Sequence, residues 1–186
     1  MENEAFNDFP QFITERLKLR EIQTDDAASI YKILSNPDVI KYDTFDLFTD
    51  IKQAYDLIDW FKDQYKDKRS IFLGISLIGQ SDIIGWCKCE IEVPKVRADL
   101  GYDLNSDYWN RGIMTESLKA IIEYVFRNLE INRIEATVST MNMASIKVLE
   151  KLSFINEGIL RERSLFNGTI HDTVMFSMLK REYHTV

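Results

Sequence analysis

Alternating hydrophobic and polar residues mark the strands of this chain. In residues 16–22, Leu17 and Leu19 alternate with Lys18 and Arg20. Successive side chains of a strand point to opposite faces, so this alternation predicts a strand with one buried face. Further strands are predicted over residues 70–78, 82–93, 97–104 and 133–139, and on either side of Asn167-Gly168, a dipeptide that favours a type I′ hairpin turn.

Hydrophobic residues repeat at helical spacing in the segments between these strands. In residues 115–130 the repeating residues are Leu118, Ile121, Ile122, Val125 and Leu129, which would share one face of a helix. The same pattern predicts helices over 49–67 and 143–154. Another helix is expected after Thr24, its expected N-cap, and it stops at Asn36-Pro37 because proline ends a helical pattern.

The predicted order of elements is β-α-α-β-β-β-α-β-α-β-β. Antiparallel hairpins, one βαβ step and a last hairpin predict a mixed α/β (α+β) fold, with a mostly antiparallel sheet of about seven strands and helices on both faces. The chain has neither a G-x-G-x-x-G motif nor a P-loop motif. We expect residues 1–12 to be a lead-in and residues 13–186 to form a single domain.

Composition narrows the classes of function. The net charge of −7 argues against a nucleic-acid binder, which would need a basic face. No apolar run reaches the ~18 residues that span a bilayer, and the acidic N-terminus lacks a signal-peptide n-region, so we expect a cytoplasmic protein with no membrane partner. Cys87 and Cys89 share one face of a predicted strand and should pack in the core. The chain has only two histidines, His171 and His184, and a lone C-x-C is poor spacing for metal ligands, so no metal site is predicted.

One glycine stands where a predicted strand turns into a helix, in the stretch NSDYWNRGIMTES. A helix that begins near Met114 leaves main-chain N–H groups without intrahelical partners, and these groups carry partial positive charge. Gly112 has no Cβ to keep a bulky anion away, and Arg111 adds a cation. These features are typical of a pyrophosphate-binding loop. The alternative is a simple turn at Gly112, with Asn110 or Thr115 capping the helix.

Longer motifs extend this interpretation. The stretches GYDLNSDYWNRGIMTES and NRIEATVSTMNMASIKVLEKLSF combine W-x-x-G-x-x-T-E, N-x-x-S and L-E-K-x-x-F. In this combination the chain closely resembles the GNAT acetyltransferase superfamily and, within it, the RimJ/RimL branch of ribosomal-protein N-terminal acetyltransferases. The resemblance covers nearly the whole chain, from ITERLKLREI to DTVMFSML. It implies a GNAT-like fold and acetyl-CoA as the acetyl donor, with no metal.

The resemblance also implies which residues contact the coenzyme. The family's loop has the form Q/R-x-x-G-x-G/A, and this chain departs from it at Trp109 and Met114. The family's splayed strand, whose main chain pairs with the pantetheine arm, corresponds to residues 102–104. The residues expected at the coenzyme are Trp109, Asn110, Arg111, Gly112, Ile113, Met114 and Thr115 in the loop, Tyr102, Asp103 and Leu104 on the strand, and Asn142 and Ser145 beyond them.

The implied reaction is direct attack of an amine on a thioester, without an acyl-enzyme. Asp99 lies where the family commonly has a catalytic glutamate, so we expect it to be the base; a plain surface acid is the other interpretation. Glu90 and Glu92, acting through a held water, are the alternative bases. Ser145 is the expected acid for the leaving thiol, although simple capping by Asn142 would explain both residues.

Other polar and aromatic residues receive more ordinary assignments. Glu116 suits a helix N-terminus electrostatically and is expected to be structural. His171 and Asp172 are adjacent, so they face opposite sides of a strand and form no dyad. An aromatic group surrounds the second predicted helix and is expected mostly in the core, with one or two members in the acceptor cleft: Tyr42, Phe45, Phe48, Tyr55 and Trp60.

The acceptor follows from the chemistry of amines. An α-amine has a pKa of ~7.7–8.0, against ~10.4 for lysine, so it needs less help from a base. The first expectation is therefore a protein N-terminal α-amine, as in ribosomal proteins. The alternatives are a small amine, such as a polyamine or aminoglycoside, or a non-catalytic acetyl-CoA-binding module. An open groove would favour a protein and a closed acidic pocket a small amine; homodimers are frequent in this branch and make a homodimer a further expectation.

Overall fold

A single mixed sheet organises the chain. The structure is a computed structural model that describes residues 6, 8–43, 45–92, 97–166 and 168–183. The strand order is β1-β2-β3-β4-β5-β6-β8-β7. The strands are β1 (Phe12–Ile13), β2 (Leu17–Glu21), β3 (Ser70–Leu77), β4 (Ile83–Ile91), β5 (Arg97–Leu104), β6 (Arg133–Ser139), β7 (Ile155–Phe166) and β8 (Thr169–Leu179).

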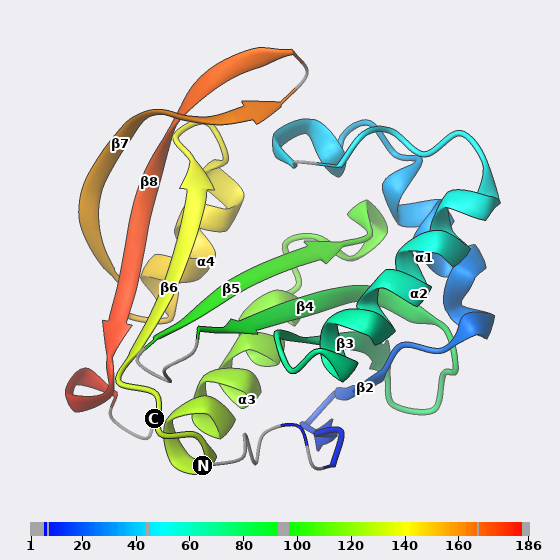
Figure 1. Ribbon diagram of the computed structural model, residues 1–186, viewed down its shortest axis with the longest axis horizontal. Coiled ribbons are helices and arrows are strands. Elements are labelled where there is room, and N and C mark those ends of the chain that lie inside the picture. The colour runs from blue at the N-terminus through cyan, green and yellow to red at the C-terminus, as the bar shows by residue number, and fades with distance from the viewer. Residues whose placement is uncertain (1–5, 7, 44, 93–96, 167, 184–186) are drawn as a thin grey trace.

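Helices cover both faces of this sheet, as Figure 1 shows. Helices α1 (Ala27–Leu34) and α2 (Ile51–Lys66) pack on one face with Phe72 and Trp86. Helices α3 (Ile113–Asn128) and α4 (Met143–Lys151) pack on the other, where they share a core with Cys87. Short 3₁₀ helices span Thr24–Asp26, Ile40–Tyr42, Ser106–Tyr108 and Lys180–Glu182. The mixed fold with helices on both faces is therefore confirmed.

The alternation of β4 assigns its side chains to the two faces. Cys87 and Cys89 are buried against α3, and both are free thiols. Burial raises the pKa of Cys89 to about 12, which keeps it an unreactive thiol. Their expected place in the core is confirmed. Trp86 and Lys88 lie on the other face, below α1 and α2.

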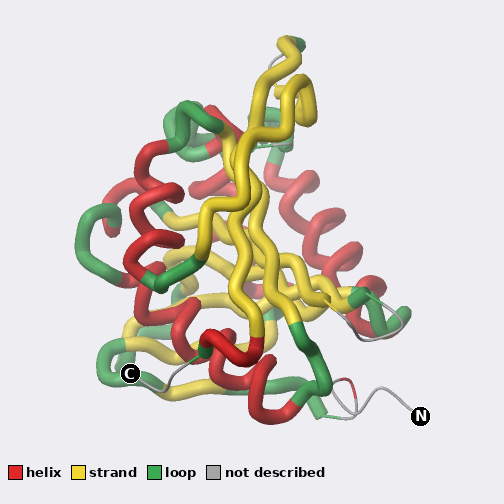
Figure 2. The backbone as a smooth tube through the Cα atoms, turned by 90° about the vertical axis from the view of Figure 1, so that its left-hand side faces the viewer, coloured by secondary structure: helices red, strands yellow, loops and turns green. Residues whose placement is uncertain are grey.

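Strands β5 and β6 are neighbours over only part of their length. All other strand pairs of the sheet are antiparallel, but β5 and β6 are parallel and pair only at Arg97↔Arg133, Ala98↔Ile134 and Asp99↔Glu135. Beyond Asp99 the two strands separate, and Figure 1 shows β5 and β6 leaving their common start in different directions. The separation opens a wedge in the middle of the sheet, bounded on its far side by the long β7–β8 hairpin, whose tip projects past the rest of the molecule in Figure 2.

The structure differs from the sequence expectations at a few element ends. The sheet has an eighth strand, β1, which begins at Phe12, inside the expected lead-in, and Phe6 is buried in the core. A two-residue strand has no period to recognise. The first helical turn begins at Thr24 with Gln23, and not Thr24, as its N-cap. Helix α3 starts at Ile113, two residues earlier than the 115–130 expected from its hydrophobic spacing. The expected type I′ turn includes Asn167, which lies outside the described residues.

Candidate active site

A cavity of about 390 Å³ fills the wedge between β5 and β6. Five parts of the chain line it: the segment after α1, helix α2, strands β3 to β6, the start of α4, and the β7–β8 hairpin. Three members of the expected aromatic group, Tyr42, Phe45 and Trp60, are among the lining residues. The cavity therefore has partly aromatic walls on the side of α1 and α2.

The main chain of β5 faces this cavity at alternate residues. In the ladder with β4, Asn105 N donates to Ile84 O at 2.8 Å and Glu92 N donates to Arg97 O at 3.1 Å. Hydrogen-bonded pairs alternate in an antiparallel ladder, so Asp103, opposite Trp86, also directs its main chain toward β4. Tyr102 and Leu104 direct theirs toward the gap. Of the expected strand residues, Asp103 is thus the one whose main chain is turned away.

The loop before α3 exposes unpaired main-chain donors. Gly112 is the N-cap residue of α3 in a left-handed conformation with φ 73°, and no side chain caps the helix. Within the described part of the chain, no hydrogen bond is formed by the main-chain N–H groups of residues 111–115, and the first intrahelical bond runs from Glu116 N to Gly112 O at 3.0 Å. The alternative of a cap at Asn110 or Thr115 is therefore wrong. These N–H groups form a small region of positive potential that suits a phosphate.

Arg16 and Thr14, in the segment just before β2, hold this loop by hydrogen bonds. Arg16 Nη1 donates to Arg111 O at 3.0 Å, and Arg16 Nε donates to Glu116 Oε2 at 2.7 Å. Thr14 Oγ1 donates to Glu116 Oε1 at 2.5 Å. Burial alone would raise the pKa of Glu116, but the bonds from Thr14 and Arg16 outweigh it and lower that pKa. The structural assignment of Glu116 agrees with these contacts.

The exposed side chains of the loop have partners of their own. Arg111 is exposed and its guanidinium lies 5.5 Å from the centre of the Tyr108 ring. Trp109 Nε1 donates to Leu104 O at 2.8 Å, so it ties the end of β5 to the loop. Met114 is buried beside Cys87, with its side chain turned away from the exposed loop, as its departure from the family pattern requires.

Asp99, the expected base, is engaged by a cation. It lines the cavity, and its carboxylate lies 3.1 Å from Lys88 Nζ. Burial raises the pKa of Asp99, and the charge and hydrogen bond of Lys88 oppose that rise. Glu90 is also paired with Lys88, at 2.9 Å, and Glu92 is paired with Arg97; neither glutamate is among the described residues that line the cavity.

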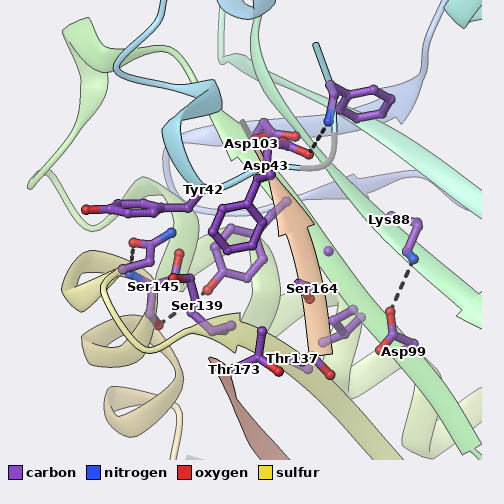
Figure 3. Close-up of a pocket in the computed structure, with 18 of the residues that line it drawn as sticks. Tyr42, Asp43, Lys88, Asp99, Asp103, Thr137, Ser139, Ser145, Ser164 and Thr173 are labelled. Carbon is purple, nitrogen blue, oxygen red and sulfur yellow. Dashed lines mark hydrogen bonds and ion pairs between the residues drawn. The ribbon is translucent and has the colours of Figure 1, made fainter. Parts of the chain in front are cut away.

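Ser145 and Asn142 lie together at the start of α4. Asn142 Oδ1 accepts a hydrogen bond from Ser145 N at 3.1 Å, so the expected N-cap is confirmed. Tyr102 Oη donates to Ser145 O at 3.4 Å, which ties the start of α4 to β5 across the gap (Figure 3). Within the described residues, the Ser145 hydroxyl itself has no hydrogen-bond partner. It lines the cavity, where it is available to a ligand.

Two acids that the sequence analysis did not connect, Asp43 and Asp103, line the same cavity. Asp43 lies in the segment after α1 and Asp103 lies on β5, and Figure 3 shows their carboxylates close together. Burial, and then the neighbouring charge of Asp43, raise the pKa of Asp103 well above its ordinary value. The alternation that places Asp99 toward the cavity places Asp103 there too. Asp43 follows a short 3₁₀ turn, and nothing in its sequence pattern indicates this position.

The remaining candidates are not drawn together. His171 stacks on Phe166 at 4.3 Å, whereas Asp172 accepts a hydrogen bond from Glu162 N at 2.8 Å. Among the described residues, no group of three or more His, Cys, Asp or Glu side chains could hold a metal ion. No helix in the described ranges is long and apolar enough to cross a bilayer.

Comparison with known sequences gives one family. The family described as acetyltransferase (GNAT) domain matches residues 16–155. An uncharacterized N-acetyltransferase of Bacillus licheniformis is 39% identical over 171 residues, 91% of this chain and 96% of that protein. The protein named "Putative ribosomal N-acetyltransferase YdaF" of Bacillus subtilis is 32% identical over 126 residues, 67% of each chain.

Comparison with solved structures gives the same architecture. An acetyltransferase of the GNAT family from Bacillus anthracis has a TM-score of 0.84 at 22% identity, over 93% of this chain and 100% of that one. A RimL ribosomal α-N-protein acetyltransferase in complex with coenzyme A has a TM-score of 0.81 at 20% identity, over 92% and 97% of the two chains. At these identities the likeness describes the fold.

Proposed function

Since the chain belongs to the GNAT acetyltransferase family, and is therefore an acetyl-CoA-dependent N-acetyltransferase, we propose that its acceptor is the α-amine at the N-terminus of a protein. The observation that carries this proposal is the ion pair between Asp99 and Lys88. Although burial raises the pKa of Asp99, Lys88 already binds its carboxylate, which is therefore not free to take a proton from a charged amine. An α-amine, with a pKa of ~7.7–8.0, is partly neutral near neutral pH, whereas a lysine amine at ~10.4 is almost wholly charged. The site therefore suits an α-amine better than a lysine side chain.

The residues of this chain fit the coenzyme as the resemblance implies. The N–H groups of residues 111–115 are placed to donate to a diphosphate, and the main chain of Tyr102 and Leu104 faces the gap that a pantetheine arm would enter. Bound acetyl-CoA supplies an acetyl thioester. The Ser145 hydroxyl has a free donor for the leaving thiol, and Asn142 fixes the position of Ser145. The acceptor approaches along the aromatic walls between α2 and the β7–β8 hairpin.

The name of one relative supports a ribosomal acceptor. YdaF carries a ribosomal N-acetyltransferase name and is 32% identical to this chain. A small amine is the second candidate, because the acids Asp43 and Asp103 line an aromatic-walled cavity that would suit a compact cation. A relative at 21% identity is the spermidine N(1)-acetyltransferase of Escherichia coli.

Release of free coenzyme A from acetyl-CoA tests the proposal. The panel contains peptides with free N-termini, the same peptides blocked at the N-terminus but carrying one lysine, and spermidine. We expect release with free N-termini and little with the blocked peptides. Turnover of spermidine alone would replace the proposed acceptor with the second candidate, and turnover of the blocked lysine peptides would contradict the argument from the Asp99–Lys88 pair.

A further inference from the structure

One large apolar side chain is buried outside both cores of the protein. Phe166, at the end of β7, is only 6% exposed, yet within the described residues it belongs neither to the core under α1 and α2 nor to the core under α3 and α4. It lines the cavity between β5 and β6 instead. Large apolar side chains are buried mainly in cores, because burial there removes them from water. The burial of Phe166 is therefore explained by the cavity and not by either core.

The alternation of the β7–β8 hairpin explains why Phe166 faces the cavity. Leu165, the residue before it, is 62% exposed, and Ile170, opposite Leu165 on β8, is 61% exposed. Successive side chains of a strand point to opposite faces, so Phe166 lies on the other face together with Ser164, which also lines the cavity. Phe166 is thus directed inward, while its apolar neighbours on the hairpin face solvent.

A bulge in β7 sets the direction of this end of the hairpin. Residues 161–163 stand opposite Asp172 alone, because the register shifts between Leu160 and Ser164. Glu162 has a left-handed φ of 53°, and its N–H donates a hydrogen bond to Asp172 Oδ1 at 2.8 Å. Bulges bend a strand and redirect the side chains beyond them. In Figure 1 the end of β7 turns toward the segment after α1, and both parts of the chain line the cavity.

The Phe166 ring is supported by a second ring. It stacks on the His171 ring at 4.3 Å with an interplanar angle of 3°. His171 is not among the described residues that line the cavity, so it backs the ring while Phe166 forms the wall. The cavity is also bordered by Tyr42, Phe45 and Trp60. An occupant of the cavity therefore meets aromatic rings from both the hairpin and the α1–α2 side.

We propose that Phe166 is a specificity-determining residue whose ring limits the size of the side chain on the first residue of the acceptor. The inference deepens the proposed function and rests on it, since it takes the acceptor to be a protein N-terminus. The α-amine and the first side chain are attached to the same carbon, so an amine that reaches the thioester carries that side chain into the cavity. The cavity has a volume of about 390 Å³ and also has to admit the acetyl end of the coenzyme. A wall made by a phenyl ring therefore admits a small first side chain, such as that of alanine, and excludes a second phenyl group.

Two acceptor peptides that differ only in the first residue, alanine or phenylalanine, test the inference by the ratio of their kcat/KM values. The parent chain should prefer the alanine peptide. Phe166→Ala frees the space of a phenyl ring, and we expect it to shift this ratio about tenfold or more toward the phenylalanine peptide, as the discrimination of a hydrophobic pocket predicts. Phe166→Leu should shift the ratio in the same direction by less. An unchanged ratio in Phe166→Ala would overturn the inference.

The matched control is Leu165→Ala, which truncates an exposed apolar residue of the same hairpin. It should keep the parent ratio. Because Phe166 belongs to neither core, Phe166→Ala should keep a melting temperature close to that of Leu165→Ala, and Phe166→Leu remains informative if the alanine variant is less stable. A shift of the ratio in Leu165→Ala as large as that in Phe166→Ala would assign the effect to the hairpin as a whole and overturn the role of the ring.

Binding of amino-acid amides separates this inference from the proposed function. Alaninamide and phenylalaninamide carry the same two side chains beside an α-amine, and their binding needs no turnover. Trp60 and Trp86 line the cavity, so their indole N–H signals in the ¹⁵N-labelled chain report an occupant. We expect Phe166→Ala to raise the affinity for phenylalaninamide relative to alaninamide about tenfold.

The two failures have different signatures. No relative gain for phenylalaninamide in Phe166→Ala would overturn the inference even if the peptide panel succeeds. A relative gain, together with a panel in which no peptide releases coenzyme A, would overturn the proposed protein acceptor and leave Phe166 as the residue that limits the size of an amine in the cavity.

Discussion

Gly112 has a backbone conformation that other residues adopt at a cost. Its φ of 73° is left-handed, while a Cβ at this position would meet only Arg16 Nη2, at 3.6 Å. The sequence argument stressed close approach of an anion to a residue without a Cβ. The structure adds a dihedral requirement, which costs an L-residue roughly 1–2 kcal/mol.

The variant Gly112→Val should raise the KM for acetyl-CoA about tenfold or more. Valine disfavours the left-handed φ of this position, so the loop should change conformation and no longer direct its N–H groups outward. The matched control is Gly79→Val, which imposes the same left-handed strain at φ 84° in the turn after β3, away from the cavity. Both variants should lose similar thermal stability, but Gly79→Val should keep the parent KM. A parent-like KM in Gly112→Val would contradict the diphosphate-binding loop.

Variants at Ser145 and Asn142 can distinguish a chemical role of the Ser145 hydroxyl from a role in capping α4. Its main-chain N–H, and not its hydroxyl, makes the bond to Asn142. Ser145→Ala therefore keeps the cap, and we expect an unchanged melting temperature with a kcat reduced about tenfold or more if the hydroxyl protonates the thiol. Asn142→Ala should instead lose about 1 kcal/mol of stability with the cap. Full kcat in Ser145→Ala would remove Ser145 from the chemistry.

At the scale of elements, the start of α3 is held by the segment just before β2. Arg16 donates hydrogen bonds to Arg111 O and to the Glu116 carboxylate, which lie 95 and 100 residues further along the chain. The stretch Thr14-Glu15-Arg16 contains the residue types for such a contact, but sequence alone does not show which part of the chain they bind. Arg16 is thus a positioning residue that the sequence analysis missed.

The variant Arg16→Ala should raise the KM for acetyl-CoA several-fold, about as a lost charge-assisted hydrogen bond predicts, with little change in kcat. Arg16→Lys should restore part of the loss, since a lysine can reach one of the two acceptors. Arg127→Ala, at the other end of α3 in an exposed pair with Glu123, is the control. If Arg16→Ala changes kcat and KM no more than Arg127→Ala, the loop does not depend on Arg16.

Periodicity predicted the long elements because each buries a continuous stripe or face. Helix α3 buries Leu118, Ile121 and Val125, as its spacing indicated. Strand β1 was missed because two residues show no alternation. The point at which β5 leaves β6 was also unpredictable, since Asp99 and Glu135 pair and the next residues do not, although no local pattern changes there.

At the scale of the whole molecule, the cavity joins segments that the sequence treats separately. Motif spacing predicted roles for Ser145, Asp99 and Gly112, because each belongs to a local stretch at a helix start or on a strand. Asp43 lies in an irregular segment and gains its position only when that segment folds over β5. Pairings of this kind depend on tertiary packing, which sequence periodicity does not report.

The Asp43–Asp103 pair makes the free energy of unfolding depend on pH. Burial first, and then Asp43, raise the pKa of Asp103 well above its ordinary value, so above that ordinary value the native chain holds a proton that the unfolded chain has released. The free energy of unfolding contributed by this group is therefore lost as pH rises through the folded pKa. Urea unfolding of Asp103→Asn should show a flatter decline toward high pH than the parent chain and than Asp46→Asn, a control at an exposed acid of the segment after α1. Parallel profiles for all three proteins would contradict the raised pKa of Asp103.

The central claim is that main-chain groups at the β5–β6 wedge and at the start of α3 bind the coenzyme. The most direct test is a titration of the ¹⁵N-labelled chain with coenzyme A, followed amide by amide. We predict saturable shifts concentrated at the N–H groups of residues 111–115 and of Tyr102 and Leu104, the groups that the structure leaves unpaired or turned toward the gap. Saturable shifts that cluster elsewhere, or no shifts at these amides, would contradict the account.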